Sequence, residues 1–305
     1  MTAPLPDAAP ANWVDRHAPA GLRPWLKLGR FDRPTGVWLL MLPGWQGVAL
    51  AGLATGRGPD LALLAKIFVG AALMRAAGCA YNDIVDRDID AKVSRTAGRP
   101  IPSGQISVRQ AWGFIVACCL VSFGLLLTMP PLAIGLGVAS LALVAAYPFM
   151  KRITWWPQAW LGLTFNWGAL LGYAAAAGEL SLAAGLLYAA GIFWTLGYDT
   201  IYAVQDLEDD ALAGVKSSAR RLGSGVGRGV LVFYLVSLAL AAAALLQGGA
   251  STLALPLFAL YAVHLILQAR RVRPDAPAQA LFLFKANAWA GLILFAAVVA
   301  GGFPI

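Results

Sequence analysis

The residues best equipped for chemistry in this chain are two clusters of acidic side chains in an otherwise apolar sequence. Nine of the 15 Asp and Glu residues fall in two short segments. The first segment contains Asn82, Asp83, Asp86, Asp88 and Asp90, and the second contains Asp199, Gln205, Asp206, Glu208, Asp209 and Asp210. A carboxylate near the bilayer is costly, about 2.5–3.5 kcal/mol at a helix centre. We therefore expect these acids to be functional.

The spacing of the acids predicts shared helix faces. Asn82, Asp86 and Asp90 follow one another at intervals of four residues, which places them on one face of a helix. Asp83 shares a face with Asp86 and Asp90. In the second segment, Asp206 and Asp210 have the same spacing, with Asp199 two turns earlier.

Clustered carboxylates repel one another and raise each other's pKa unless cations lie between them. Mg²⁺ relieves this repulsion, and it typically binds one or two carboxylates together with waters and phosphate oxygens. Basic residues lie beside the acids in sequence or end a neighbouring apolar span, namely Arg75, Arg87, Lys151, Arg152 and Lys216. Carboxylates, a metal ion and Arg or Lys together predict a diphosphate site.

The remainder of the chain has the composition of a membrane protein. It has 305 residues, of which 59% are hydrophobic and 12% are charged. Nine apolar spans are predicted, at about 35–54, 60–81, 109–128, 131–148, 157–176, 180–200, 226–246, 250–268 and 281–303. A site for a diphosphate inside such a protein favours a lipid-tailed substrate, with its head at the membrane face and its tail between apolar helices.

The basic residues predict the orientation in the membrane. Of the 23 Lys and Arg residues, 20 lie at the N-terminus, in alternate loops or at span ends on one side, and only Arg57 lies on the other. This asymmetry places the N-terminus and both acidic segments in the cytoplasm. The net charge of +8 therefore reports orientation, and we expect no nucleic-acid partner.

The N-terminal region and the cysteines add little chemistry. Residues 1–20 have neither the apolar core of a secretory signal nor the pattern of a transit peptide, so residues 1–34 are predicted to form a flexible tail and an interfacial helix. A single transmembrane domain is expected over 35–303. Cys79, Cys118 and Cys119 all lie in spans and show no metal-ligand spacing.

Several stretches resemble motifs of the UbiA superfamily, the intramembrane aromatic prenyltransferases. The run from Asn82 to Asp90, with Arg99-Pro100-Ile101-Pro102-Ser103-Gly104, resembles their first motif. The second motif is resembled by Tyr198 to Asp206, Asp209-Asp210 and Gly214-Val215-Lys216-Ser217. Residues 30–36 and 147–152 are similar to the branch that prenylates 4-hydroxybenzoate. The resemblance covers about residues 25–300.

The resemblance implies an all-α fold of nine transmembrane helices around a central cavity, in the inner membrane of a bacterium. It implies transfer of a polyprenyl group from polyprenyl diphosphate to 4-hydroxybenzoate, in ubiquinone biosynthesis. Two Mg²⁺ ions would be bound by Asn82, Asp86, Asp90, Asp206 and Asp210. The diphosphate would be bound by Arg75, Arg87, Lys151 and Lys216. Arg152 would pair with the benzoate carboxylate, and Asp199 would polarise the phenol or take the ring proton.

Three alternatives remain open from the sequence. A related enzyme would prenylate dihydroxynaphthoate, homogentisate or a porphyrin, and Arg152 with the pattern of the second motif favours 4-hydroxybenzoate over these. A secondary transporter would place its acids near the midplane on broken helices, whereas here they lie at the ends of spans. A phosphatidyl-transferring enzyme would show an Asp-Gly opening that is absent from this pattern.

Overall fold

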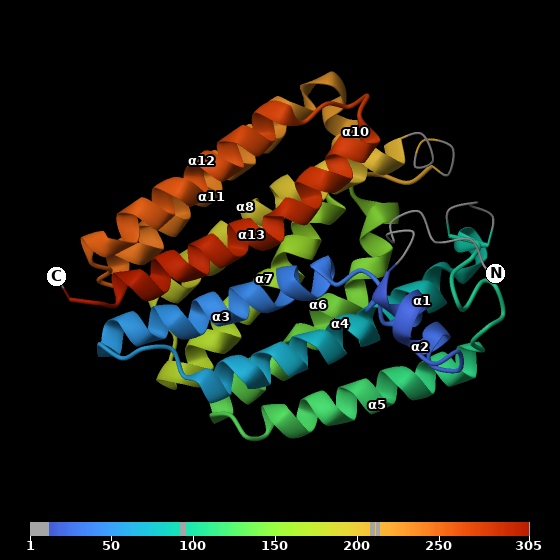
Figure 1. Cartoon of the computed structure of the whole chain (residues 1–305), viewed down its shortest axis with the longest axis horizontal. Helices are drawn as coiled ribbons and strands as arrows, with labels where there is room; N and C mark the ends of the chain where they lie inside the picture. Colours follow the sequence, from blue (N-terminus) through green and yellow to red (C-terminus); the bar gives the residue numbers. More distant parts are fainter. Residues whose placement is uncertain (1–11, 92–95, 208–210, 212–213, 305) are drawn as a thin grey trace. The chain divides into compact units, whose positions relative to one another are not determined.

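The structure is a computed structural model that describes residues 12–91, 96–207, 211 and 214–304, and every regular element in these ranges is helical (Figure 1). The chain forms two compact units, each described by itself. The N-terminal unit comprises Met1–Trp38 and Phe68–Thr128, and the C-terminal unit comprises Leu39–Ile67 and Met129–Ile305. The single domain expected over 35–303 stays a prediction.

The α-helices match the predicted spans closely. They are α1 (Trp13–His17), α2 (Arg23–Leu28), α3 (Thr35–Thr55), α4 (Leu61–Asp90), α5 (Val108–Leu126), α6 (Pro131–Ile153), α7 (Pro157–Ala177), α8 (Leu182–Ala203), α10 (Ser218–Leu222), α11 (Val226–Gln247), α12 (Leu255–Arg271) and α13 (Pro277–Gly301). Short 3₁₀ turns are η1 (Val204–Asp206), η2 (Gly223–Gly225) and η3 (Thr252–Ala254).

Within the described ranges, 7 helices are long and apolar enough to cross a membrane: α3, α4, α5, α6, α10 with α11, η3 with α12, and α13. The other two predicted spans, 157–176 and 180–200, fall on α7 and α8. These two helices carry buried polar residues, such as Asn166 on α7 and Thr195 on α8, which lower their apolar character. Their polar groups are paired, since the Asn166 amide donates to the Thr195 hydroxyl at 2.7 Å.

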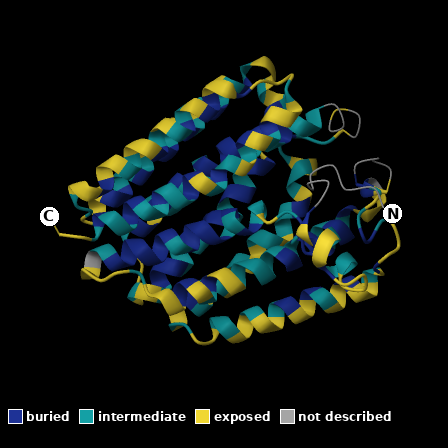
Figure 2. Cartoon of the chain, viewed as in Figure 1, coloured by how far each residue is buried: buried dark blue, intermediate teal, exposed yellow. Residues whose placement is uncertain are grey.

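The core of the N-terminal unit forms between α4 and α5. Small side chains of α4, including Ala76 and Ala80, pack with Ala111 and Ile115 of α5, and α2 adds Leu28. The opposite face of α5 is exposed and apolar (Figure 2). That pattern fits a helix with one side against the protein and the other against lipid.

Residues 12–17 do not form the flexible tail that the sequence predicts. Asn12 caps α1, and Val14 on this helix is fully buried. The Trp13 indole donates to the Phe31 carbonyl at 2.7 Å, and Lys27 pairs with Asp15 at 2.7 Å. An apolar anchor, a cap and an ion pair therefore fix α1 on α2, although the surrounding composition is that of a tail.

In the C-terminal unit, α8 packs between α7 and α11 and also contacts α13. Its buried face joins Trp194 and Ile201 to Tyr234 of α11 in one apolar core. Glycines allow the closest approach of α3 and α7, because a Cβ at Gly47 would collide with the Ala169 carbonyl and one at Gly172 with the Gly44 carbonyl. The packing of α8 against α7, α11 and α13 positions the end of α8, where the second acidic segment begins.

Candidate active site

The first acidic segment forms the last turns of α4, which is one continuous helix of 30 residues. Because the spacing is four residues, the Asn82 amide reaches Asp86 and donates to its carboxylate at 3.0 Å. Asp86 and Asp90 are 1% and 7% exposed. The helix thus presents an amide and two buried carboxylates on successive turns, as the spacing predicts.

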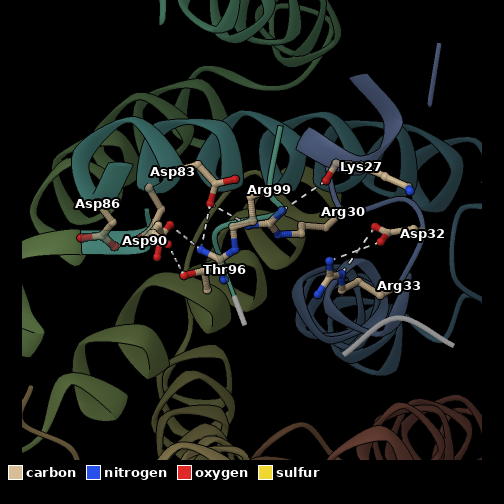
Figure 3. Close-up of polar contacts among 10 residues, drawn as sticks. Lys27, Arg30, Asp32, Arg33, Asp83, Asp86, Asp90, Thr96 and Arg99 are labelled. Carbon is tan, nitrogen blue, oxygen red and sulfur yellow. Dashed lines mark hydrogen bonds and ion pairs between the residues drawn. The ribbon is translucent and has the colours of Figure 1, made fainter. Parts of the chain in front are cut away.

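Asp83 lies on this helix but has different partners. Its carboxylate is fully buried, and its Oδ1 accepts from Arg30 at 2.6 Å and from Arg99 at 3.2 Å (Figure 3). The same Arg99 nitrogen also lies 2.7 Å from Asp90. Arg30, Asp83, Asp90 and Arg99, here called the ion cluster, therefore join α4 to the α2–α3 turn and to the loop after α4.

The loop after α4 is held by further contacts. The Thr96 hydroxyl donates to the backbone carbonyl of Asp90 at 2.9 Å, at the end of the helix, and the Arg99 amide donates to the Thr96 carbonyl at 2.9 Å. Burial raises the pKa of Asp90, the Arg99 charge opposes this rise, and Asp83 and Asp86 reinforce it. This is the electrostatic setting in which a bound cation is stabilised.

Two further predicted residues, Arg75 and Arg87, stand in different surroundings. The Arg75 guanidinium lies against the first turn of α3, where a Cβ at Gly36 would be 2.7 Å from its Nε. Arg87 is half-exposed and pairs with the exposed Asp88 at 3.4 Å. Arg75 is therefore held within the N-terminal unit, whereas Arg87 lies at its surface.

The second acidic segment begins on α8 and leaves it at a 3₁₀ turn. Asp199 lies on α8, while Asp206 ends the turn η1. The 3₁₀ turn winds three residues per turn and shifts the register of Asp206 relative to an α-helix, while Asp199 still lies about two turns before it, as the spacing predicts. The predicted ligand Asp210 lies outside the described residues.

Neutral hydrogen bonds position this segment. The hydroxyls of Thr200 on α8 and Ser218 on α10 lie 2.6 Å apart, and the Ser218 amide donates to the Gln158 side chain of α7 at 3.1 Å. All three residues are buried. Ser217 caps α10. These bonds return the chain to the end of α8 after the acidic segment.

The basic residues predicted for this region come together around the end of α6. Lys151 and Arg152 occupy its last turn. The Lys216 backbone amide donates to the Lys151 carbonyl at 3.1 Å, and its ammonium donates to the Ile153 carbonyl at 3.1 Å. A lysine on the last carbonyls of a helix is a favourable cap. The fold therefore unites the three predicted cations, although Lys216 uses one hydrogen bond on the helix end.

The first segment suits Mg²⁺. In the ranges that the structure describes, no group of three His, Cys, Asp or Glu side chains is arranged to hold a metal. Mg²⁺ does not require such a cage, since it keeps waters and shares phosphate oxygens. Asn82 and Asp86, 3.0 Å apart on one face of α4, are an amide and a carboxylate of the kind it binds.

Sequence reasoning did not assign the roles that Arg30 and Arg99 take in the ion cluster. Each opens a stretch that resembles family motifs, at residues 30–36 and 99–104. The charge of Arg30 suggests only membrane orientation, and Arg99 is one of several basic residues that follow the first acidic segment, where it could bind a diphosphate or anchor the membrane face. Their shared partner Asp83 lies 53 and 16 residues away in sequence, so no local spacing signals the pairing.

Long apolar helices, one of which ends in buried acidic side chains beside a buried arginine, define an integral membrane protein with a charge-rich site. The sequence pattern of the UbiA prenyltransferase family matches residues 40–291, and the chain belongs to this family.

Relatives align along most of the chain. The rat protein named 4-hydroxybenzoate polyprenyltransferase, mitochondrial, is 44% identical over 292 residues, which cover 94% of this chain and 77% of that protein. The human protein of the same name is 44% identical, covering 93% of this chain and 76% of its own length.

Solved structures share the fold. A UbiA homologue from Aeropyrum pernix K1, solved without ligand, superposes with a TM-score of 0.73 at 29% identity, covering 86% of this chain and 96% of that one. An Archaeoglobus fulgidus homologue solved with GPP and Mg²⁺ gives a TM-score of 0.63 at 19% identity, covering 90% of this chain and 99% of that one. At that identity the second likeness concerns the fold alone.

Proposed function

We propose that this protein transfers a polyprenyl group from polyprenyl diphosphate to the ring carbon ortho to the hydroxyl of 4-hydroxybenzoate, an early membrane step of ubiquinone biosynthesis. The observation that carries the proposal is the 44% identity over 94% of the chain to a protein of that name. The site supports it, because its acids and cations suit a diphosphate and its helices suit a lipid tail.

The diphosphate is proposed to bind through both acidic segments. Asn82, Asp86 and Asp90 would hold one Mg²⁺, and Asp206 with Asp210 a second. Support comes from the Asn82–Asp86 contact at 3.0 Å and from the Mg²⁺ and GPP bound in the Archaeoglobus homologue. Bound Mg²⁺ would supply positive charge to the leaving group.

Basic side chains would add further positive charge around the diphosphate. Arg75, Arg87, Lys151 and Lys216 would stabilise the diphosphate as the allylic C–O bond breaks and the electron pair leaves with it. The Lys216 backbone amide is bonded to the Lys151 carbonyl and the Lys216 ammonium to the Ile153 carbonyl, so Lys216 lies at the end of α6. This contact brings the Lys216 chain close to Lys151, so the two cations would act on one diphosphate.

We propose that Arg152 and Asp199 bind the acceptor, 4-hydroxybenzoate. Arg152 would bind the benzoate carboxylate through two parallel hydrogen bonds. Asp199 would accept the phenol proton or polarise the hydroxyl, so that the ortho carbon attacks the allylic cation and a new C–C bond forms. Loss of the proton from that carbon restores the aromatic ring.

The protein is proposed to lie in the inner membrane of a bacterium, with its acidic segments and N-terminus on the cytoplasmic face. The support is the distribution of Lys and Arg, 20 of 23 of which fall on one predicted side. The rat and human relatives are, by their names, mitochondrial proteins.

A direct assay tests the reaction. Membranes containing the protein are incubated with a polyprenyl diphosphate, 4-hydroxybenzoate and Mg²⁺, and the products are read by mass spectrometry. We expect the prenylated acid, its loss with EDTA, and no product from dihydroxynaphthoate or homogentisate. The Asp275→Asn variant is the matched control, because it removes a carboxylate from an exposed ion pair with Arg273. Metal-dependent product from another acceptor alone would overturn the acceptor assignment.

A further inference from the structure

The ion cluster holds two acids and two arginines in a small buried space, and Arg99 lies between the acids. One of its nitrogens is 2.7 Å from Asp90 and 3.2 Å from Asp83. A second guanidinium, from Arg30, fixes Asp83 at 2.6 Å. Asp90 is a proposed metal ligand, and Arg99 occupies one of its two carboxylate oxygens.

Arg30 pairs with Asp83 although its backbone adopts a conformation that arginine disfavours. Arg30 has φ of 59°, in the left-handed region, and is the residue after the C-cap of α2. The Phe31 amide donates to the Leu26 carbonyl and the Arg30 amide to the Lys27 carbonyl, the two bonds of a Schellman turn. Glycine is the usual residue there. An arginine in this position is explained by its buried contact with Asp83.

The Asp83 carboxylate has a second oxygen that could accept a further hydrogen bond from Arg99. Its Oδ1 accepts from both arginines, whereas its Oδ2 is buried and accepts no hydrogen bond from any residue that the structure describes. A buried carboxylate gains from further donors, since an unmade hydrogen bond is costly there. The guanidinium has a second acceptor within reach if Asp90 is taken by a cation.

We propose that Asp83 is a positioning residue that holds Arg99 when Asp90 binds Mg²⁺, and so keeps Asp90 available to the metal. The inference rests on the proposed function. Without the Asp83 charge, Arg99 would pair with Asp90 alone in a buried setting and would compete with the ion. Asp83 would thereby act on metal affinity without touching metal or substrate.

The test measures metal binding directly. Purified full-length protein is titrated with Mn²⁺, and free Mn²⁺ is followed by electron paramagnetic resonance, with a non-reactive prenyl diphosphate analogue present. Asp83→Asn is expected to weaken Mn²⁺ binding at least about tenfold, the equivalent of one lost charge contact. Turnover at saturating Mg²⁺ should stay close to wild type, since the ligands themselves are intact.

A double variant separates competition from structural damage. In Asp83→Asn with Arg99→Gln, the competing charge is gone, so Mn²⁺ binding should return to within about threefold of wild type. Asp275→Asn is the control for an exposed acid paired with arginine and should bind Mn²⁺ unchanged. If Asp83→Asn alone does not give folded protein, Arg99→Gln alone should bind Mn²⁺ more tightly than wild type.

The outcomes are distinct. Equal Mn²⁺ binding by wild type and Asp83→Asn would overturn the inference and leave the proposed function standing. Weak binding by the double variant, or no tightening in Arg99→Gln, would likewise reject the competition. A wild type that binds no Mn²⁺ would overturn the metal assignment and the inference together.

Discussion

The two acidic segments have similar compositions but are positioned by different interactions. The first lies on one continuous helix, α4, and two of its acids, Asp83 and Asp90, are held by arginines from other parts of the chain. The second begins on α8, changes to a 3₁₀ turn, and is flanked by the neutral contact of Thr200 with Ser218.

This difference indicates how each segment should respond to change. In the first segment a cation that binds Asp90 would share or compete for that carboxylate with Arg99, so metal binding would be coupled to the arrangement of the arginines. The Thr200–Ser218 contact beside the second segment carries no charge, so a change in that contact should act on the segment through geometry. The two segments should therefore respond differently to substitution, although their acidic residues are similar.

The largest expected effect tests whether the two segments share one role. Asp86→Asn and Asp206→Asn should each lower turnover about 10²–10³-fold, because each removes a charge that would hold Mg²⁺ on the leaving group. Initial rates in membranes containing equal amounts of protein measure this. Asp275→Asn should remain at the wild-type rate.

Membrane insertion distinguishes chemistry from folding in these variants. Both proteins should insert and purify as the wild type does, because Asp86 and Asp206 are assigned to a metal and not to the core. Near-normal turnover in only one of the two variants would show that the segments do not contribute equally to metal binding.

The second prediction concerns specificity within the C-terminal unit. Arg152→Ala should raise KM for 4-hydroxybenzoate about tenfold or more, the cost of a charge-assisted contact, with little effect on KM for the donor. Lys151 is the adjacent residue in the last turn of α6. Lys151→Ala should raise KM for the donor, with little effect on KM for 4-hydroxybenzoate. Steady-state kinetics with each substrate varied in turn provide the measurement.

Equal changes in both KM values for Arg152→Ala would instead identify this residue as a diphosphate contact. Arg152→Lys refines the result, because lysine keeps the charge but cannot form two parallel bonds. We expect this variant to lie between the wild type and the alanine variant in acceptor KM.

The third prediction tests whether the uncharged Thr200–Ser218 hydrogen bond positions the second segment. Thr200→Val leaves the Ser218 hydroxyl without its partner at 2.6 Å and should cost about 1–2 kcal/mol of stability. The donor KM should rise a few-fold, because Lys216 precedes the cap of α10. Thermal unfolding in detergent and donor kinetics check both effects.

Thr200→Ser is the matched control, since it keeps the hydroxyl and should behave as the wild type. If the valine and serine variants had the same melting temperature and donor KM, the hydroxyl contact would have no positioning role. A charge-based effect like that expected for the first segment is not anticipated in either variant.

Most of the fold could be predicted from apolar periodicity. Predicted spans such as 35–54 and 157–176 correspond to Thr35–Thr55 and Pro157–Ala177. Errors occur at the ends, where composition is mixed. The span predicted from 250 starts as a helix at Leu255, because Thr252–Ala254 forms a 3₁₀ turn.

The site could be predicted only where spacing is local. The four-residue interval brings Asn82 to Asp86, and the sequence carries that information. The pairing of Arg30 with Asp83 depends on how α2 packs on α4, and no pattern in either segment specifies the partner. The 3₁₀ turn that ends at Asp206 likewise follows α8 without a glycine or proline to signal it.

The smallest effect concerns the ion pair at the N-terminus, which resembles the first segment in using charge but is partly exposed. The Lys27 ammonium at 2.7 Å holds the pKa of Asp15 below its usual value of 3.8. A lowered native pKa means that the contribution to stability is complete above 3.8 and is lost as the pH falls through the native value. The docking of α1 should therefore weaken only in acid.

Hydrogen exchange of peptides covering residues 12–20, corrected for the intrinsic rate, measures this docking. At pH 7, Asp15→Asn should exchange slightly faster than the wild type, because the neutral amide cannot pair with Lys27. As the pH falls through the lowered pKa of Asp15, the two proteins should converge, because protonation then removes the charge from the wild type as well. A difference that persists unchanged in acid would assign the effect of the substitution to the Asn12 contact with Asp15 and not to the ion pair.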